Sequence, residues 1–112
     1  SRETYTVSTG IESRVENEMP FVRRVGTEIQ EGFIDRLVLI EREGRVVAAE
    51  VLDFKTDKIE SGDEAQLEER KAHYEPQIAA YCDAVSERYG LAASDVVGKL
   101  VFLSAGVVVS VN

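Results

Sequence analysis

Apolar residues gather in two runs near the middle of the chain, and their spacing predicts a β-hairpin. Residues 34–40 and 46–54 are rich in β-branched and aliphatic side chains, which favour strands. Residues 42–44 between them supply a short turn that contains glycine. The stretch VVAAEVL in the second run is typical of a central strand covered on both faces. We therefore expect two antiparallel neighbours here.

A further strand is predicted before this hairpin, from about Val15 to Val25. Pro20 cannot donate to a ladder, so we expect this strand at an edge of the sheet. Gly32 in the next strand predicts a bulge or a close backbone approach beside a nucleic-acid site, or simply a bend. Residues 4–8 fit either a short strand or a disordered lead, and we assign residues 1–13 to a lead segment.

A helical period follows the hairpin. The polar residues 58–70 predict a loop that leads into a helix, with Ser61 or Asp63 as its N-cap. Pro76 should kink that helix or begin a second one, and Gly90 should end it. The apolar positions that recur at spacings of three, four or seven are Leu67, Tyr74, Ile78, Tyr81 and Val85. This face is expected to pack on the sheet.

Two short apolar segments, residues 99–103 and 107–111, follow the helix and are joined by a glycine turn. The whole pattern predicts an α/β fold, in which an antiparallel meander, a long helix and two further strands form a mixed sheet of about five strands. A chain of 112 residues fits a single domain with one core.

Three charged side chains converge on the predicted hairpin. Because side chains alternate along a strand, Asp53 and Lys55 project from one face and Phe54 from the other. If a turn closes at residues 43–44, the partner of Asp53 on the first arm lies within about two residues of Asp35, close enough for a cross-strand pair on the order of 5 Å apart. Two carboxylates and a lysine suit a divalent cation such as Mg²⁺, a nucleophilic water and a phosphate group. The residues therefore predict phosphodiester hydrolysis.

Simpler interpretations of the same residues stay open. Asp35 could be a solvated acid paired with Arg36, and Asp53 with Lys55 could be an ordinary surface ion pair. Gln77 and Tyr81 are four residues apart and share a helix face. By packing alone they are a boundary residue and a core aromatic.

Three other polar residues are not assigned to the site. Glu18 is expected to be an exposed strand glutamate, although it could add an acid to the site. Glu50 lies an odd number of residues from Asp53, so it should point away from the site and serve the structure. His73, the only histidine, is expected to be solvated and not a metal ligand.

Composition limits the possible partners. A net charge of −8 argues against an autonomous DNA-binding surface, since phosphate neutralisation needs an excess of Lys and Arg. The single Cys82 excludes an internal disulfide and a four-cysteine iron–sulfur cluster. No run approaches the ~20 apolar residues of a membrane span and no signal peptide is visible, so we expect a cytoplasmic location and no membrane partner.

The arrangement of Asp35, then DFKTD at residues 53–57, then QIAAY at residues 77–81 resembles the PD-(D/E)XK nuclease superfamily. More narrowly, GFIDR, LDFKTD and YEPQIAAY are similar to the C-terminal nuclease domain of RecB/AddA-type helicase-nucleases, which is associated with UvrD/Rep-type helicases. The resemblance covers roughly residues 14–104 and implies a restriction-endonuclease-like core. The combination is far more specific than D-x-K alone.

The resemblance also implies roles for individual residues. Asp35, Asp53 and the backbone carbonyl of Phe54 would bind Mg²⁺, with Mn²⁺ as a substitute, and Lys55 would be the catalytic lysine. The residues implied to support the site or contact DNA are Gln77, Tyr81 and Thr56. The implied activity is that of an (exo)deoxyribonuclease in recombination or double-strand-break repair.

The implied partners are DNA, as a single strand or a duplex end, and helicase motor domains in cis or in a partner helicase-nuclease subunit, with a nucleoid-associated location. One departure concerns a helix before the first strand that contributes a histidine in RecB-type enzymes, because nothing before Glu18 matches it. The chain is therefore expected to be a fragment of a larger helicase-nuclease, and activity of the fragment alone is in question.

Two rival functions stay open. One is a catalytically silent relative that serves as a DNA-end-binding clamp or scaffold in the same assembly. The other is an unrelated α/β interaction domain whose acidic surface binds a basic partner. The first rival normally lacks the Asp or the Lys, and the second predicts no specific Mg²⁺ or Mn²⁺ site.

Overall fold

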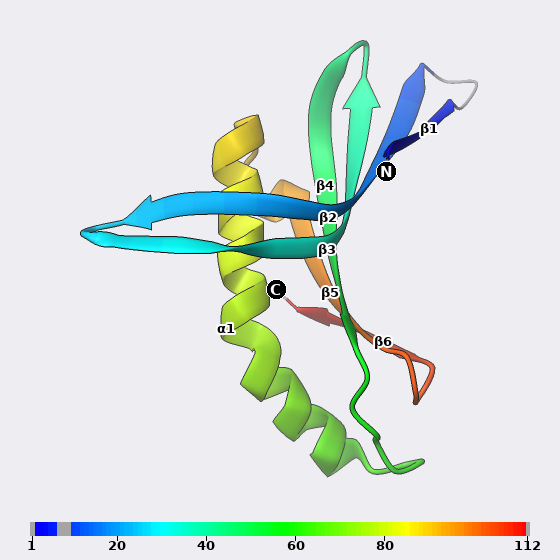
Figure 1. Ribbon diagram of the computed structural model, residues 1–112. Helices are drawn as coiled ribbons and strands as arrows, with labels where there is room; N and C mark the ends of the chain where they lie inside the picture. Colours follow the sequence, from blue (N-terminus) through cyan, green and yellow to red (C-terminus); the bar gives the residue numbers. More distant parts are fainter. Residues whose placement is uncertain (1, 7–9, 112) are drawn as a thin grey trace.

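The computed structural model describes residues 2–6 and 10–111, which form one mixed sheet and a long helix (Figure 1). The elements in chain order are β1 (Arg2–Thr6), β2 (Ile11–Val25), β3 (Glu28–Arg42), β4 (Arg45–Lys55), α1 (Glu64–Tyr89), a 3-10 turn (Ala93–Asp95), β5 (Val96–Phe102) and β6 (Val107–Val111). The strands lie side by side in this same order. All neighbours are antiparallel except β4 and β5, which are parallel, so the predicted mixed α/β arrangement is confirmed.

The sheet has six strands in the described part of the chain, one more than expected, because Arg2–Thr6 forms β1. This strand pairs with residues 12–16 of β2, so the edge position expected for residues 15–25 is wrong only at Val15 and Glu16, which β1 covers. Pro20 lies beyond the residues that β1 covers, where that side of β2 carries no partner strand in the described structure. Residues 1 and 7–9 of the predicted lead segment lie outside the described residues.

The turn between β3 and β4 forms where it was expected. Arg42 pairs with Arg45, and the two residues between them, Glu43 and Gly44, have φ of 52° and 78°. A two-residue loop with positive φ at both positions matches the twist of the flanking strands. The turn alone would pair Asp35 with Leu52, and a register shift between Ile40 and Glu41 moves the pairing by one residue and so brings Asp35 towards Asp53.

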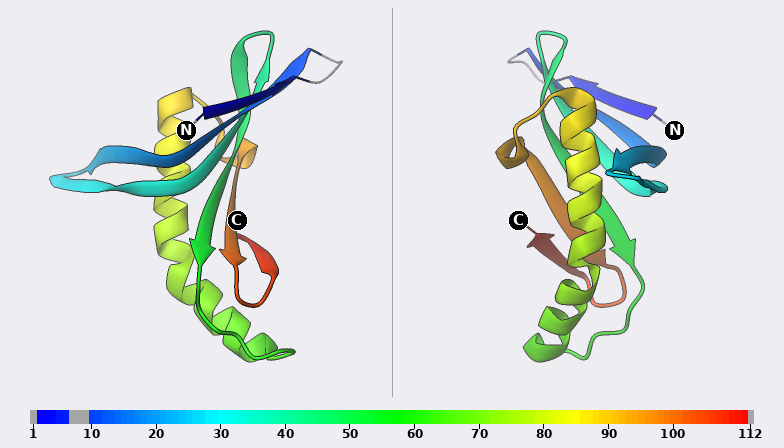
Figure 2. Two further views of the ribbon diagram at one scale, coloured as in Figure 1. Left: turned by 45° about the vertical axis from the view of Figure 1, so that its right-hand side comes forward. Right: turned by 90° about the vertical axis from the view of Figure 1, so that its left-hand side faces the viewer.

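A single helix follows the hairpin. Asp63 caps its start by accepting a hydrogen bond from the Gln66 backbone N–H at 2.9 Å, and Gly90 ends it in the left-handed conformation. Pro76 lies inside the helix, which bends along its length (Figures 1 and 2). Of the two outcomes expected of Pro76, a second helix does not begin there, and the single helix runs through the proline although this residue removes a helical hydrogen bond and crowds the preceding turn. Among the described residues, no helix is long and apolar enough to cross a membrane.

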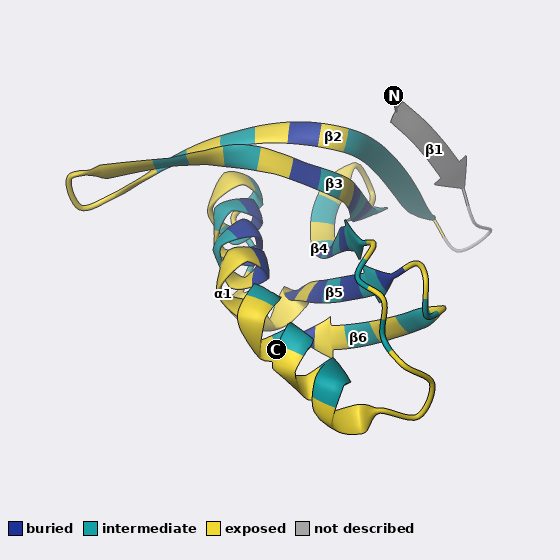
Figure 3. Ribbon diagram, turned by 60° about the horizontal axis from the view of Figure 1, so that its bottom comes forward, coloured by how far each residue is buried: buried dark blue, intermediate teal, exposed yellow. Residues whose placement is uncertain are grey.

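The core lies between α1 and one face of the central strands. Figure 3 shows the buried positions of the helix on the side that faces the sheet and exposed positions on its far side. The largest fully buried side chains are Phe102, Ile34, Leu37, Leu39, Ile78, Leu100, Val51 and Val96. The hairpin of β2 and β3 extends past the helix as an arm whose tip is exposed (Figures 2 and 3).

Gly98 permits the close approach of α1 to β5. A Cβ at this position would lie 3.0 Å from Cys82 Sγ and 3.0 Å from Ile78 Cγ1, closer than packed side chains normally come. The absence of a side chain at residue 98 therefore sets how closely the helix packs on the strand.

We expect Gly98→Ala to lower the free energy of unfolding by about 1–3 kcal/mol, because the added methyl overpacks this contact. Thermal unfolding should show a melting temperature several degrees lower. Ser110→Ala, at an exposed position on the neighbouring strand, is the matched control and should be close to neutral. Equal melting temperatures for the two variants would contradict this account of the packing.

Candidate functional site

The candidate site lies at a fork where β3 and β4 separate. Their ladder pairs Arg36 with Leu52 as its last rung in this direction, and the same register would place Asp35 opposite Asp53. Beyond this point β3 turns away with β2 into the arm, while β4 continues beside β5 (Figure 1). The fork therefore brings together two carboxylates that are 18 positions apart in the sequence.

Both strands of the arm are irregular where the fork opens. Glu18 of β2 has a positive φ of 51°, and it faces the row of Asp35 between two regular pairs. On β3, Ile34 and Leu37 are both buried although they are three residues apart, so the alternation of faces is lost between them. This irregularity turns the side chain of Asp35 from an ordinary strand position into the fork.

Asp35 closes the end of the ladder with its side chain. Its Oδ2 accepts a hydrogen bond from the Phe54 backbone N–H at 2.8 Å, where a backbone carbonyl would otherwise be expected. Arg36 does not pair with it in the described contacts. The Arg36 guanidinium instead donates to Asn17 Oδ1 at 2.9 Å and lies 5.3 Å from the centroid of the Phe54 ring. The interpretation of Asp35 as an acid paired with Arg36 is therefore wrong.

Asp53 is the one buried charged residue among the residues that the structure describes, with 5% of its surface exposed. Its Oδ2 is buried and accepts no hydrogen bond, and Lys55 Nζ lies 3.3 Å from it as an ion pair. Burial raises the pKa of the Asp53 carboxyl to about 6, and Asp35 adds to the rise while Lys55 opposes it. This is a carboxylate whose charge is incompletely compensated by the protein.

Lys55 is held on three sides. Besides Asp53, its ammonium donates to Gln77 Oε1 at 3.1 Å and lies 4.1 Å from the centroid of the Tyr74 ring. Its side chain is only 17% exposed, so Asp53 and Lys55 do not form an ordinary surface ion pair. The long, flexible lysine side chain is confined by residues of the strand and of the helix.

The helix places Tyr81 and Gln77 at different depths. Tyr81 is buried, with its ring edge-on to Phe21 at a centroid distance of 5.0 Å. Burial raises the pKa of the Tyr81 phenol, and the charges of Asp53 and Asp35 raise it further, because its polar end lies on the side of the two carboxylates. Gln77 is exposed and contacts Lys55. Tyr81 is thus a core aromatic with its phenol near the fork.

Thr56 lies just past the end of β4 and is exposed. Its carbonyl oxygen accepts a hydrogen bond from Ser104 Oγ at 3.3 Å. This contact ties the end of β4 to the turn after β5, and it does not involve the carboxylates.

Gly32 is explained by side chains and not by a nucleic-acid backbone. A Cβ there would lie 2.9 Å from Phe21 Cε1 and 3.4 Å from the Tyr81 hydroxyl. Gly32 pairs in regular register with Phe21, so the predicted bulge is not found at this residue. The missing side chain makes room for the Phe21 and Tyr81 pair beside the fork.

The three polar residues left out of the site lie as predicted. Glu18 is exposed, and Glu50 forms an ion pair with Lys99 at 3.0 Å on the other face of the sheet. His73 is exposed and lies edge-on to the neighbouring Tyr74. None of the three contacts the carboxylates in the described structure.

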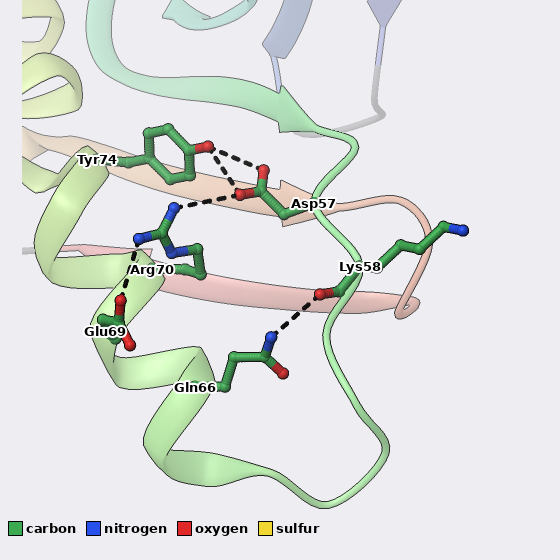
Figure 4. A network of polar contacts seen from close by, with 6 residues as sticks. All are labelled: Asp57, Lys58, Gln66, Glu69, Arg70 and Tyr74. Atoms are coloured by element: carbon green, nitrogen blue, oxygen red, sulfur yellow. Dashed lines mark hydrogen bonds and ion pairs between the residues drawn. The ribbon is translucent and has the colours of Figure 1, made fainter.

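Sequence reasoning missed a second cluster next to Lys55, which Figure 4 shows. The Tyr74 hydroxyl lies 2.9 Å and 2.8 Å from the two carboxylate oxygens of Asp57, and Arg70 Nη1 lies 3.7 Å from Asp57 Oδ2. Two signals could have indicated it. Tyr74 precedes Gln77 by three residues on the same helix face, and Asp57 closes the motif that contains Lys55.

The fork fits a hard divalent cation. No cluster of three or more His, Cys, Asp or Glu side chains in the described part of the chain could hold a metal by itself. Two carboxylates remain, and Mg²⁺ commonly takes one or two of these together with waters and substrate phosphate oxygens. The buried Asp53 oxygen without a hydrogen-bond donor is an available ligand for such an ion.

The sequence comparisons agree with this chemistry. The family model of the PD-(D/E)XK nuclease superfamily matches residues 3–107. No curated protein matches the chain.

We expect Asp53→Asn to stabilise the metal-free protein by about 1–2 kcal/mol at pH 8, because a neutral amide removes the cost of a buried charge. The folded-state pKa of about 6 lies above the ordinary 3.8, so this cost is present above pH 6 and disappears as the pH falls towards 4. The stability difference between variant and wild type should therefore shrink across that window. Thermal unfolding in a chelator, repeated across this pH range, measures it.

Asp57→Asn is the matched control, because Asp57 is a half-buried aspartate whose oxygens are contacted by Tyr74 and Arg70. This variant should lose stability at pH 8. If Asp53→Asn melted below the wild type at pH 8, our description of Asp53 as an uncompensated charge would be wrong.

Proposed function

Because the chain belongs to the PD-(D/E)XK nuclease superfamily, we propose that it is a metal-dependent DNA nuclease that hydrolyses phosphodiester bonds at the fork between β3 and β4. The observation that carries the proposal is the buried Asp53 carboxylate, whose Oδ2 accepts no hydrogen bond and which lies beside a second acid and a lysine. A buried, incompletely paired charge lowers the stability of a protein, and such charges are typical of sites where a bound ligand compensates them.

Asp35, Asp53 and the backbone carbonyl of Phe54 would hold the ion, which is Mg²⁺ or its substitute Mn²⁺. When bound, such an ion lowers the pKa of a water ligand and neutralises charge on the phosphate. All the proposed protein donors are oxygens, which suits these hard cations. The Phe54 N–H bond to Asp35 supports the set, because it fixes the acid against the residue whose carbonyl is the third donor.

Lys55 would orient the attacking water or stabilise the charge that develops on the phosphate. Its ammonium lies 3.3 Å from Asp53 Oδ2, beside the place where that chemistry would occur. Gln77 would hold the ammonium, and the phenol of Tyr81 would face the same space. Thr56, exposed at the end of the strand, would contact the DNA backbone.

DNA, as a single strand or a duplex end, is the proposed substrate, and exonucleolytic cleavage in recombination or double-strand-break repair is the proposed setting. The motifs GFIDR, LDFKTD and YEPQIAAY support a RecB/AddA-type domain. Because a net charge of −8 disfavours DNA binding by this chain alone, other modules would have to hold the DNA, and we propose helicase motor domains, in cis or in a partner subunit, for this task. On this proposal residues 1–112 are one nuclease domain of a larger, nucleoid-associated protein.

A silent DNA-end-binding or scaffold domain is the second candidate. The lack of a third acidic, His or Cys ligand among the described residues favours it. The presence of Asp35, Asp53 and Lys55 together favours the nuclease. Metal binding separates the two candidates more directly than DNA binding does.

We expect the chain to bind Mn²⁺, as measured by titration calorimetry, and Asp53→Ala to weaken this binding at least tenfold. Asp83→Ala, which removes an exposed carboxylate of the helix, is the control and should bind as the wild type does. Equal Mn²⁺ affinities for the wild type and Asp53→Ala would contradict the proposed metal site.

Lys55→Met should separate binding from chemistry. The variant removes the ammonium and keeps much of the side-chain volume, so Mn²⁺ binding should persist while cleavage of labelled single-stranded DNA falls roughly 100-fold. The assay compares rates at saturating Mn²⁺. Cleavage by Lys55→Met at the wild-type rate would exclude Lys55 from the reaction.

A further inference from the structure

The ammonium of Lys55 rests on the aromatic ring of Tyr74, a residue to which the resemblance assigns no role. Lys55 Nζ lies 4.1 Å from the centroid of the Tyr74 ring, well within the range of a cation–π interaction. Its other two contacts are Asp53 Oδ2 at 3.3 Å and Gln77 Oε1 at 3.1 Å. Of the three side chains that contact the ammonium, β4 therefore supplies one and α1 supplies two.

The Tyr74 ring is itself anchored. Its hydroxyl meets both carboxylate oxygens of Asp57, at 2.9 Å and 2.8 Å, and Arg70 lies on the same carboxylate (Figure 4). The pKa of the Tyr74 phenol is raised by burial and by Asp57, which keeps the hydroxyl protonated as a donor. The other side of the ring packs towards Phe102, at a centroid distance of 6.4 Å. Two fixed neighbours thus define where the ring lies.

Asp57 follows Lys55 by two residues, so the last residue of β4 is the lysine and the segment just after it carries the carboxylate that holds the Tyr74 ring. The loop after Asp57 is tied to the same part of the helix. Gln66 Nε2 donates to the Lys58 carbonyl at 3.3 Å, and the Glu60 N–H donates to Gln66 Oε1 at 2.8 Å. These contacts tie the first turn of α1 to the loop that follows Asp57.

We propose that Tyr74, anchored by Asp57, is a positioning residue that fixes the Lys55 ammonium for the reaction. The inference rests on the proposed nuclease function. An ion bound at the fork would draw on the negative charge of Asp53 and so weaken its hold on Lys55. The ring of Tyr74 and the amide of Gln77 would then be the contacts that keep the lysine aimed, since a lysine side chain has four rotatable bonds.

The ring current of Tyr74 gives a test that does not depend on activity. Protons on the Lys55 Cε lie near the face of the ring, so their NMR resonances should be shifted upfield. Tyr74→Leu should abolish this shift and lower kcat for single-stranded DNA about fivefold to tenfold, with KM changed less than twofold. Tyr74→Phe keeps the ring and should retain the upfield shift and most of kcat.

Tyr89→Leu is the matched control, because Tyr89 is another half-buried tyrosine of α1 and it lies against Arg88, away from the fork. Tyr74→Met, which fills more of the space, serves as a second variant if Tyr74→Leu does not fold. The proposal is overturned if the Lys55 resonances in the Tyr74 variants match the wild type, or if kcat falls no further than in Tyr89→Leu. If the wild type does not cut DNA, the nuclease proposal fails and the resonances alone decide whether Tyr74 fixes Lys55.

Discussion

Asp53 keeps a carboxylate between a sheet and a helix, where charge is costly, and the neighbouring contacts follow from that placement. The ladder between β3 and β4 ends beside it, and Asp35 takes the N–H of Phe54 where the strands separate. Lys55 gives Asp53 Oδ2 an ion pair and no hydrogen bond, so the charge of the carboxylate is only partly compensated. If stability alone determined the residue at position 53, an apolar side chain would be expected there.

The helix has a second task besides covering the core. Pro76 lies between Tyr74 and Gln77, the two helix residues that contact the Lys55 ammonium. Gly98 and Gly32 allow the helix and its aromatic residues to approach the sheet closely. Packing of α1 therefore determines both the stability of the domain and the direction of one lysine.

Local pattern was enough to predict the hairpin turn at Glu43 and Gly44 and the shared face of Asp53 and Lys55, and it narrowed the N-cap to two residues, one of which is Asp63. These features depend on backbone preference and on alternation within one element. The Tyr74 and Asp57 contact was missed because it depends on where the helix start lies relative to the end of β4. The strand β1 was left open, since a short polar segment acquires strand structure only from its partner.

Anomalous scattering from crystals soaked in Mn²⁺ is the most direct test of a metal ion bound at the fork. We predict a peak at the fork, roughly 2 Å from a carboxylate oxygen of Asp35 and of Asp53 and close to the Phe54 carbonyl. Such a peak would establish that the buried carboxylate is a metal ligand. Peaks confined to surface acids elsewhere, with none at the fork at saturating Mn²⁺, would contradict the account.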